Sequence, residues 1–587
     1  MEKLTTEWNL KDIYQSEEDV LLDFQKIKNL NKEFVSFKGK LNTKENILNY
    51  FQKSEALRKI EEKFCAYLYL RKSANGKDDF SRKVLAEYEM FSLELSPQLA
   101  FIAPELSKNK EDNLKSYMCE KEFSNYTLEL QNIIDNKKHV LPEKISSVLA
   151  NNASFGGFAE AFKNFNDIDL KYGYITTPEG KQELTDASYL RFIKHKDQNV
   201  RKKAYNQLHK SFANFNYTLG TLYLSDVKET LFFNKIKKYK TVLESCCKED
   251  KTDIKVLPTL IKSVRKNLFH FYRFEKLKKE LMKVDKYYYF DNYYELGENN
   301  QMFSYEDSVK IICDALKIMG PEYVNVISDA CKNGWVDVYE RPAKSNGGFC
   351  LYVYGVHPYV LLNHVNTFNC VSTLAHEMGH AMHGYLSEKK QPITKSEASI
   401  FACEVASTVN EILLDKYMIE NAKNKQEKMF YLHQLLMKFY TTLYRQTMFS
   451  EFEYFVYSSM EQGKPLLVDD LNKKYEELQA LYFGKEALKT PYSKFEWSRI
   501  PHFYRPYYVY KYSTGFISAC IIAYNIMAKK EGYRQKYIDF LSAGESENPI
   551  DLLKSVEVDI TNEKTLNEAF KLYENLLNEF DQLTKEN

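Results

Sequence analysis

Most of the chain places apolar residues three and four positions apart with charged residues between them. This spacing is clearest over residues 47–69, 82–95 and 200–233, and it is the pattern of helices with one buried face. Proline and glycine are sparse, at 14 and 20 of 587 residues, which favours long helices over a sandwich or a barrel. The pattern therefore predicts a mainly α-helical protein.

Two segments depart from the helical pattern. Residues 168–175, followed by Pro178-Glu179-Gly180, predict a short hairpin between helical blocks. Residues 347–356 begin with a glycine pair and continue with aromatic and β-branched residues, which predicts a strand that Pro358 closes. We expect this strand to belong to a small β-sheet, and its main chain could bind an extended peptide as an added strand.

The length and composition point to a folded chain with more than one core. A hydrophobic fraction of 44% and an aromatic fraction of 15% exclude general disorder, and 587 residues suffice for two or three cores. We place a boundary near residue 190, between an N-terminal helical lobe (1–190) and a second domain (191–587). No flexible linker marks this boundary.

Charge and cysteine usage narrow the possible partners and compartment. The formal net charge is +1, from 82 basic and 81 acidic side chains, so nothing in the charge balance attracts nucleic acid or an anionic membrane. The ten cysteines form no C-x-x-C pair, residues 1–8 lack the features of a signal peptide, and the longest apolar run, residues 514–529, is too short to span a bilayer. We expect a soluble protein of the reducing cytoplasm.

The most informative motif is His376-Glu377-Met378-Gly379-His380. The surrounding residues 368–386 contain no proline and predict a helix, on which two histidines four positions apart lie on one face. Such a pair suits a tetrahedral zinc ion, and the glutamate between them is placed to act as general base on the attacking water. Two buried histidines bonded to carbonyl groups are the non-functional alternative.

A zinc site needs a third protein ligand. The extended pattern H-E-x-x-H-x-x-G-x-x-H is absent, because His383 replaces its glycine and Leu386 its third histidine. Thr394-Lys395-Ser396-Glu397 predicts a capping box that starts a second helix, on which Glu397, Glu404 and Glu411 share one face.

Glu404 is favoured as the third ligand, because its neighbours are apolar and a buried carboxylate is costly without a cation. Glu411 could accept a hydrogen bond from a ligand histidine, and Glu397 could serve only in the cap. His383 is a rival ligand, although a structural or substrate-facing role is favoured for it.

These residues resemble the oligoendopeptidase F family, a branch of the thimet-oligopeptidase-like zinc metallopeptidases. The resemblance extends over most of the chain, including residues 152–155, and rests above all on four segments: residues 354–359, the motif at 376–383, the block at 404–411 and the tyrosine-rich block at 499–512. It implies a helical fold of two lobes around a deep channel that admits short peptides and excludes folded proteins.

The resemblance also implies the roles of individual residues. His376, His380 and Glu404 would bind one zinc ion per chain, with Glu377 as the general base. His502 and tyrosines of the C-terminal block would bind substrate and stabilise the oxyanion; Tyr507 and Tyr510 are the first choices, with Tyr508 and Tyr512 as competitors.

The sequence therefore predicts a zinc-dependent endopeptidase that cleaves internal bonds of short peptides. A related zinc exopeptidase, such as a carboxypeptidase or a peptidyl-dipeptidase, is the nearest alternative, and a catalytically silent peptide-binding protein is another. We expect a monomer with neither nucleic acid nor membrane as a partner.

Overall fold

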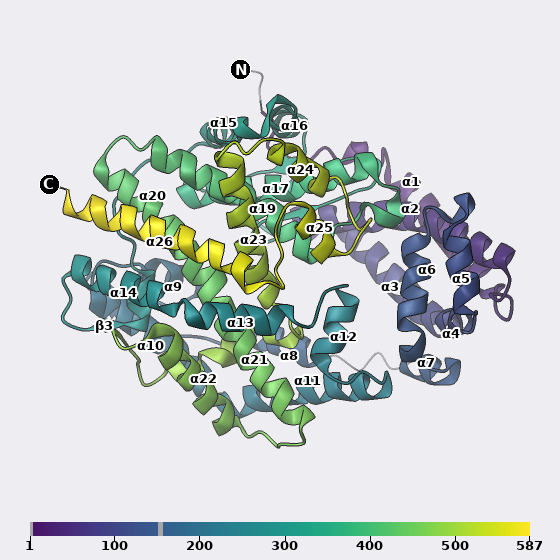
Figure 1. Ribbon diagram of the computed structural model, residues 1–587, viewed down its shortest axis with the longest axis horizontal. Coiled ribbons are helices and arrows are strands. Elements are labelled where there is room, and N and C mark those ends of the chain that lie inside the picture. Colours follow the sequence, from purple (N-terminus) through teal and green to yellow (C-terminus); the bar gives the residue numbers. More distant parts are fainter. Residues whose placement is uncertain (1–3, 151–156, 587) are drawn as a thin grey trace.

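The computed structural model describes residues 4–150 and 157–586, and in this part the chain is mainly α-helical with a few short strands (Figure 1). The N-terminal helices gather on one side of the molecule, at the right of Figure 1. They are α1 (Glu17–Val35), α2 (Lys44–Ala74), α3 (Asp79–Leu99), α4 (Ile102–Ser107), α5 (Glu111–Met118), α6 (Thr127–Asn136) and α7 (Glu143–Ala150).

The remaining helices form the larger part of the molecule. The first group is α8 (Gly157–Asn164), α9 (Asp186–Ile193), α10 (Gln198–Ala213), α11 (Asn216–Ile236), α12 (Val242–Glu249), α13 (Val256–Lys266), α14 (Leu268–Met282), α15 (Tyr305–Ala315) and α16 (Pro321–Lys332). The second group is α17 (Phe368–Lys390), α18 (Ile393–Ser396), α19 (Ile400–Glu420), α20 (Lys425–Lys438), α21 (Arg445–Glu461), α22 (Val468–Phe483), α23 (Tyr510–Met527), α24 (Tyr533–Leu541), α25 (Pro549–Ser555) and α26 (Glu563–Lys585).

The predicted helices are largely confirmed, with one break. Residues 47–69 lie inside α2, residues 82–95 inside α3 and residues 368–386 inside α17. The predicted helix 200–233 is two helices, because the chain leaves helical geometry at Phe215, with φ −113° and ψ 17°. Asn214 and Asn216 flank that residue, and asparagine side chains compete with the helix for backbone hydrogen bonds.

The predicted hairpin is present but begins later than expected. Strands β1 (Tyr174–Thr177) and β2 (Gly180–Glu183) pair antiparallel, and Pro178 and Glu179 form the turn. Ile168 and Asp169, the first two residues of the predicted hairpin, instead lie in a short π-helical turn, residues 165–169, at the end of α8. A second pair, β3 (Tyr287–Tyr288) and β7 (Ala487–Leu488), runs parallel.

The predicted strand at 347–356 is also shorter than expected. Only β5 (Phe349–Leu351) is strand, and the chain after it turns back through a hydrogen bond from Val356 N–H to the Val353 carbonyl at 3.0 Å. Pro358 does not end the sheet, because β6 (Tyr359–Leu361) follows it and lies between β5 and β4 (Val336–Asp337). β5 is therefore an edge strand, and it packs beside α17.

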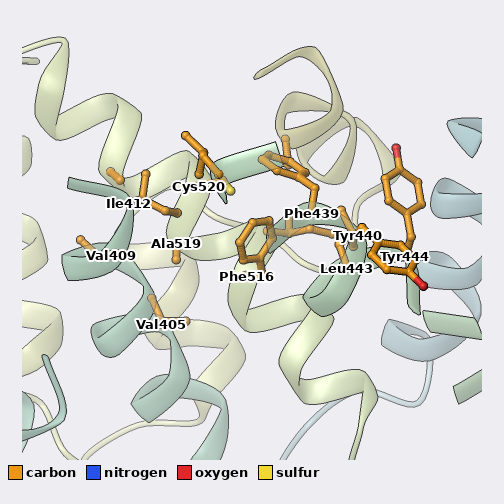
Figure 2. Packing of buried hydrophobic residues seen from close by; sticks show 14 of the residues in the cluster. Val405, Val409, Ile412, Phe439, Tyr440, Leu443, Tyr444, Phe516, Ala519 and Cys520 are labelled. Carbon is orange, nitrogen blue, oxygen red and sulfur yellow. The ribbon is translucent and has the colours of Figure 1, made fainter. Parts of the chain in front are cut away.

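Three helices, α17, α19 and α23, form the centre of the larger part. Figure 2 shows Val405, Val409 and Ile412 of α19 facing α23. The apolar run at 514–529 thus belongs to a buried helix of the core. Phe439 follows α20 and stands edge-on against Phe516 of α23 with ring centroids 4.8 Å apart, which ties α20 to the same core (Figure 2).

The N-terminal helices have their own apolar clusters but are tied to the larger part. Trp8 donates its indole N–H to the Val360 carbonyl at 2.8 Å, and the Thr6 carbonyl accepts a hydrogen bond from Val338 N–H at 3.0 Å. Val353 and Tyr359 complete the apolar cluster of α1 and α2. The domain boundary near residue 190 stays a prediction.

Within the described residues, no helix is both long and apolar enough to cross a membrane. The ten cysteines, all in the described ranges, are free thiols.

Candidate metal centre and active site

The candidate site lies where α17 and α19 touch. Gly379, in the middle of the histidine motif, permits this close approach, because a Cβ there would lie 2.5 Å from Ser407 Cα and 2.6 Å from the Ala406 carbonyl oxygen. On the far side of α19, Gly515 of α23 approaches Glu404, with a Cβ position 3.2 Å from Glu404 Cβ. The small residues thus fix the spacing between the histidines and Glu404.

His376, His380 and Glu404 meet at this contact. One ligand atom of each lies within 4.8 Å of the other two, and in the described part of the chain this is the one such group of three or more. The Nε2 atoms of the two histidines are 3.2 Å apart, and His376 Nε2 lies 4.0 Å from Glu404 Oε2. The structure therefore brings together the three residues expected as metal ligands.

The chemistry of these three residues fits a zinc ion. Two nitrogens bound tetrahedrally to one zinc, at about 2.05 Å each, would be roughly 3.3 Å apart, close to the spacing of the two Nε2 atoms. Glu377 Oε2 is buried and has no hydrogen-bond partner among the described residues, so the site holds a polar group that the protein alone does not satisfy. Two imidazoles and a carboxylate form a donor set typical of catalytic zinc.

Glu411 fixes the orientation of His376. The His376 Nδ1–H donates to Glu411 Oε1 at 2.6 Å, which leaves Nε2 directed at the ligand group. Burial would lower the pKa of His376, yet this hydrogen bond raises it overall to about 9. Burial would likewise raise the pKa of Glu411, but the Lys438 ammonium holds it well below its usual range. The hydrogen bond expected from a ligand histidine to Glu411 is thus present.

Glu377 lies beside the ligands with its carboxylate largely enclosed. Its side chain is 6% exposed, and burial raises the pKa of the carboxyl to about 7 against the opposing effect of His376. Gly348, next to β5, is close enough that a Cβ there would lie 3.2 Å from Glu377 Oε1. The carboxylate therefore stands between the ligand group and the edge strand.

Burial also shifts the pKa values of the other two ligands. It lowers the pKa of His380 well below its usual value, so the imidazole is neutral and able to bind a cation. It raises the pKa of Glu404 against the opposing effect of His376, and the Glu411 carboxylate adds to the rise. A cation in the site would relieve this cost.

The predicted capping box is wrong, and Glu397 has another role. α18 ends at Ser396, and α19 begins only at Ile400, after Ser399. Glu397 lies between the two helices and pairs with Arg58 of α2 at 2.9 Å, so it links the N-terminal helices to the larger part. The cause is the extended backbone of residue 397, with ψ near 137°, which ends the first helix.

His383 does not belong to the ligand group. It is 1% exposed, neither ring nitrogen has a partner among the described residues, and its ring stacks on Phe540 at 6.0 Å. This position agrees with the structural role favoured over metal binding.

His502 and two tyrosines form a cluster near Glu404. The His502 ring lies 6.1 Å from the Tyr508 ring and 5.9 Å from the Tyr512 ring, and the two tyrosines are 5.4 Å apart. Burial raises the pKa of Tyr512, and Tyr508 and the Glu404 carboxylate raise it further. Tyr512 therefore lies within electrostatic reach of a candidate ligand. Burial and the neighbouring Arg505 lower the pKa of His502.

Tyr507 and Tyr510, the first choices from the sequence, lie elsewhere. Tyr507 is 1% exposed, packs against Tyr457 at 5.3 Å and donates its backbone N–H to Glu453 at 2.7 Å. Tyr510 is fully buried and stands edge-on to Phe401 at 5.6 Å. The backbone of Tyr507 is left-handed, with φ +49°, and α23 begins at Tyr510. Both features affect the direction in which each tyrosine of the block points.

Three residues around Glu411 were not expected from the sequence. Lys438 contacts Glu411 and Asp415 at 2.7 Å each, and Ser372 donates to Glu411 Oε2 at 3.2 Å. A lysine at the end of a helix is normally on the surface, so no pattern in the sequence predicts the contacts of Lys438. Asp415 lies four residues after Glu411 on α19, and this spacing was the one available clue.

Known proteins share this fold. The family model "Peptidase family M3" matches residues 191–572, and the model "Oligopeptidase F" matches residues 105–172. The chain therefore belongs to peptidase family M3, and by that membership it is a metallo-endopeptidase.

Within that family, relatives of this chain include oligopeptidases of the F type. The chain is 31% identical to oligopeptidase PepF of Bacillus subtilis over 98% of its own length and 87% of that protein. It is 30% identical to an oligoendopeptidase F homolog of Borreliella burgdorferi, with 98% of both chains covered. The crystal structure of oligoendopeptidase-F from Enterococcus faecium matches with a TM-score of 0.76 and 27% identity, over 96% of this chain and 99% of that one.

Proposed function

We propose that the protein is a zinc-dependent oligoendopeptidase that hydrolyses internal bonds of short peptides. The single observation that carries the proposal is the convergence of His376, His380 and Glu404 beside the unpartnered carboxylate of Glu377. Membership of peptidase family M3 and the names of the relatives support the same reaction.

His376, His380 and Glu404 would hold the zinc ion. When bound, zinc supplies a Lewis acid that polarises the scissile carbonyl and lowers the pKa of a coordinated water to about 7. Glu411 keeps His376 in the tautomer that presents Nε2 to the metal.

Glu377 would move the proton. Its Oε2 has no hydrogen-bond partner, so it can accept the proton of the attacking water and return it to the leaving amine. Burial raises the pKa of the Glu377 carboxyl, which favours its accepting a proton.

Tyr508 and Tyr512, with His502, would orient the substrate and donate hydrogen bonds to the developing oxyanion. This replaces Tyr507 and Tyr510 in that role, because those two pack against Tyr457 and Phe401 and not with His502.

The substrate main chain would lie along β5. This strand has a free edge, and Gly348 brings its start beside Glu377. A cavity of about 390 Å³ adjoins it, lined among others by Leu351, Tyr352 and Gly384 on one side and by Arg58 and Glu62 of α2 on the other. Main-chain pairing along β5 gives affinity without strict side-chain selection.

The test is hydrolysis of an end-blocked, internally quenched peptide, with mass spectrometry of the fragments. We expect internal cleavage that stops with a chelator and returns with zinc. Release of single residues or dipeptides from unblocked peptides alone would indicate the exopeptidase, and binding without cleavage would indicate the silent peptide-binding protein. Cytoplasmic location and a monomeric state remain part of this proposal.

A further inference from the structure

Lys438 is a largely buried cation that contacts Glu411 directly. It is the last residue of α20, and its side chain is 20% exposed. Its ammonium lies 2.7 Å from Glu411 Oε2, 2.7 Å from Asp415 Oδ2 and 3.2 Å from Ser372 Oγ. An ammonium has three N–H groups, so all of its donors are directed at these three acceptors.

These contacts connect Lys438 to a candidate metal ligand. One oxygen of Glu411 accepts the hydrogen bond from His376 Nδ1, and the other receives Lys438 and the hydroxyl of Ser372. A carboxylate held at both oxygens cannot rotate away from the imidazole. Lys438 therefore acts on the orientation of His376 through Glu411, although it does not touch the ligand group itself.

The backbone at Lys438 is anchored on the core. Immediately after it, α20 passes into a π-helical segment, η7 (Phe439–Tyr444), a rare conformation that is frequent at functional sites. Phe439 stands edge-on against Phe516 of α23 (Figure 2). The packing of Phe439 against the core thus also holds the Lys438 ammonium in position relative to α19.

We propose that Lys438 is a positioning residue of the metal site, which orients His376 for metal binding through Glu411. The proposal rests on the proposed zinc site. A purely structural lysine that only pins α20 to α19 predicts lower stability on removal with unchanged metal affinity. A positioning lysine predicts a loss of metal affinity.

The test is the zinc affinity of the metal-free protein, measured by competition with a chromophoric chelator, for the wild type, Lys438→Met, Glu411→Gln and the double variant. Loss of a residue that orients a ligand typically lowers metal affinity about 10- to 100-fold, and we expect this for each single variant. Because Lys438 acts through Glu411, the double variant should lose no more than Glu411→Gln alone. Losses that add in the double variant would overturn the proposal.

Lys278→Met is the matched control. Lys278 is a fully buried lysine that also contacts α20, through His433 Nε2 at 3.0 Å, and it donates to the Asn292 carbonyl at 2.8 Å. Among the described residues, its hydrogen bonds reach Asn292, Tyr294, His433 and Met437 and none reaches α17 or α19. We expect Lys278→Met to lower the unfolding temperature and to leave zinc affinity within about twofold of the wild type.

The outcomes separate this proposal from the one it rests on. A wild type that fails to bind zinc at one site per chain would overturn both. A wild type that binds zinc, together with a Lys438→Met variant of equal affinity, would overturn the role of Lys438 alone. If Lys438→Met does not fold, Lys438→Gln, which keeps an N–H donor but removes the charge, takes its place, and zinc affinity equal to that of the wild type would overturn the role of Lys438.

Discussion

Replacing Gly379 with alanine should separate the two helices that carry the proposed ligands. The added Cβ would lie 2.5 Å from Ser407 Cα and 2.6 Å from the Ala406 carbonyl oxygen, both backbone atoms that cannot rotate away. Relief to an ordinary contact of about 3.5 Å requires α17 and α19 to move apart by roughly 1 Å. Metal-ligand distances tolerate only about 0.2 Å.

The size of the effect follows from the cost of overpacking. Forcing a methyl group into a packed contact costs about 1–3 kcal/mol, and a strain of that size opposing the metal-bound geometry weakens affinity about 5- to 150-fold. We therefore expect Gly379→Ala to lower the free energy of unfolding by about 1–3 kcal/mol and to raise the zinc dissociation constant about 5- to 150-fold.

Two further glycine variants test whether the loss of zinc affinity depends on how close a contact the added Cβ makes. At Gly515 the added Cβ would meet Glu404 Cβ at 3.2 Å, so a smaller loss of zinc affinity is expected. At Gly157, in α8, the added Cβ would meet no packed neighbour within 4 Å among the described residues, and Gly157→Ala should leave zinc affinity unchanged. Urea unfolding and chelator competition measure the two quantities. Zinc affinity within twofold of the wild type for Gly379→Ala would refute the claim that this glycine sets the ligand spacing.

Three further predictions address the reaction and the stability of the fold. Glu377→Gln should retain zinc and lose about 10²- to 10⁴-fold in hydrolysis of the quenched peptide, and substantial remaining activity would remove Glu377 as the base. Tyr512→Phe should lower kcat about 10²- to 10³-fold while Tyr507→Phe stays within a few-fold, and the reverse order would restore the choice made from the sequence. Burial, reinforced by Glu229, raises the pKa of Asp226 to about 7, so between about pH 4 and pH 7 the folded chain keeps a proton that the unfolded chain releases. Stability should therefore fall as pH rises through that window, and Asp226→Asn should gain stability relative to the wild type; parallel pH profiles in urea unfolding would contradict this.

The local pattern of the sequence predicts those parts of the fold and site that depend on short-range geometry. Two histidines four apart share a helix face wherever the helix packs, and Glu404 in an apolar stretch requires a buried partner. Both inferences need only the helix period and the cost of burying charge, and the structure brings these residues together.

The remaining features depend on contacts or conformations that the local pattern does not specify. Tyr507 has a left-handed backbone, and the tyrosines whose rings pack with His502 are Tyr508 and Tyr512; the composition of a tyrosine-rich segment predicts neither feature. Lys438 is buried only because Glu411 and Asp415 of another helix meet it. The strand is shorter than the predicted 347–356 because the chain after Leu351 turns back toward β6. This turn depends on tertiary contacts, which the β-propensity of the residues does not describe.

The most direct test of the central claim is an anomalous-scattering crystal structure of the zinc-loaded protein, collected at the zinc absorption edge. We expect one zinc peak per chain, about 2.0–2.2 Å from a nitrogen of His376, a nitrogen of His380 and an oxygen of Glu404. A peak bound by other residues, or no peak at this site with zinc present in excess, would contradict the account.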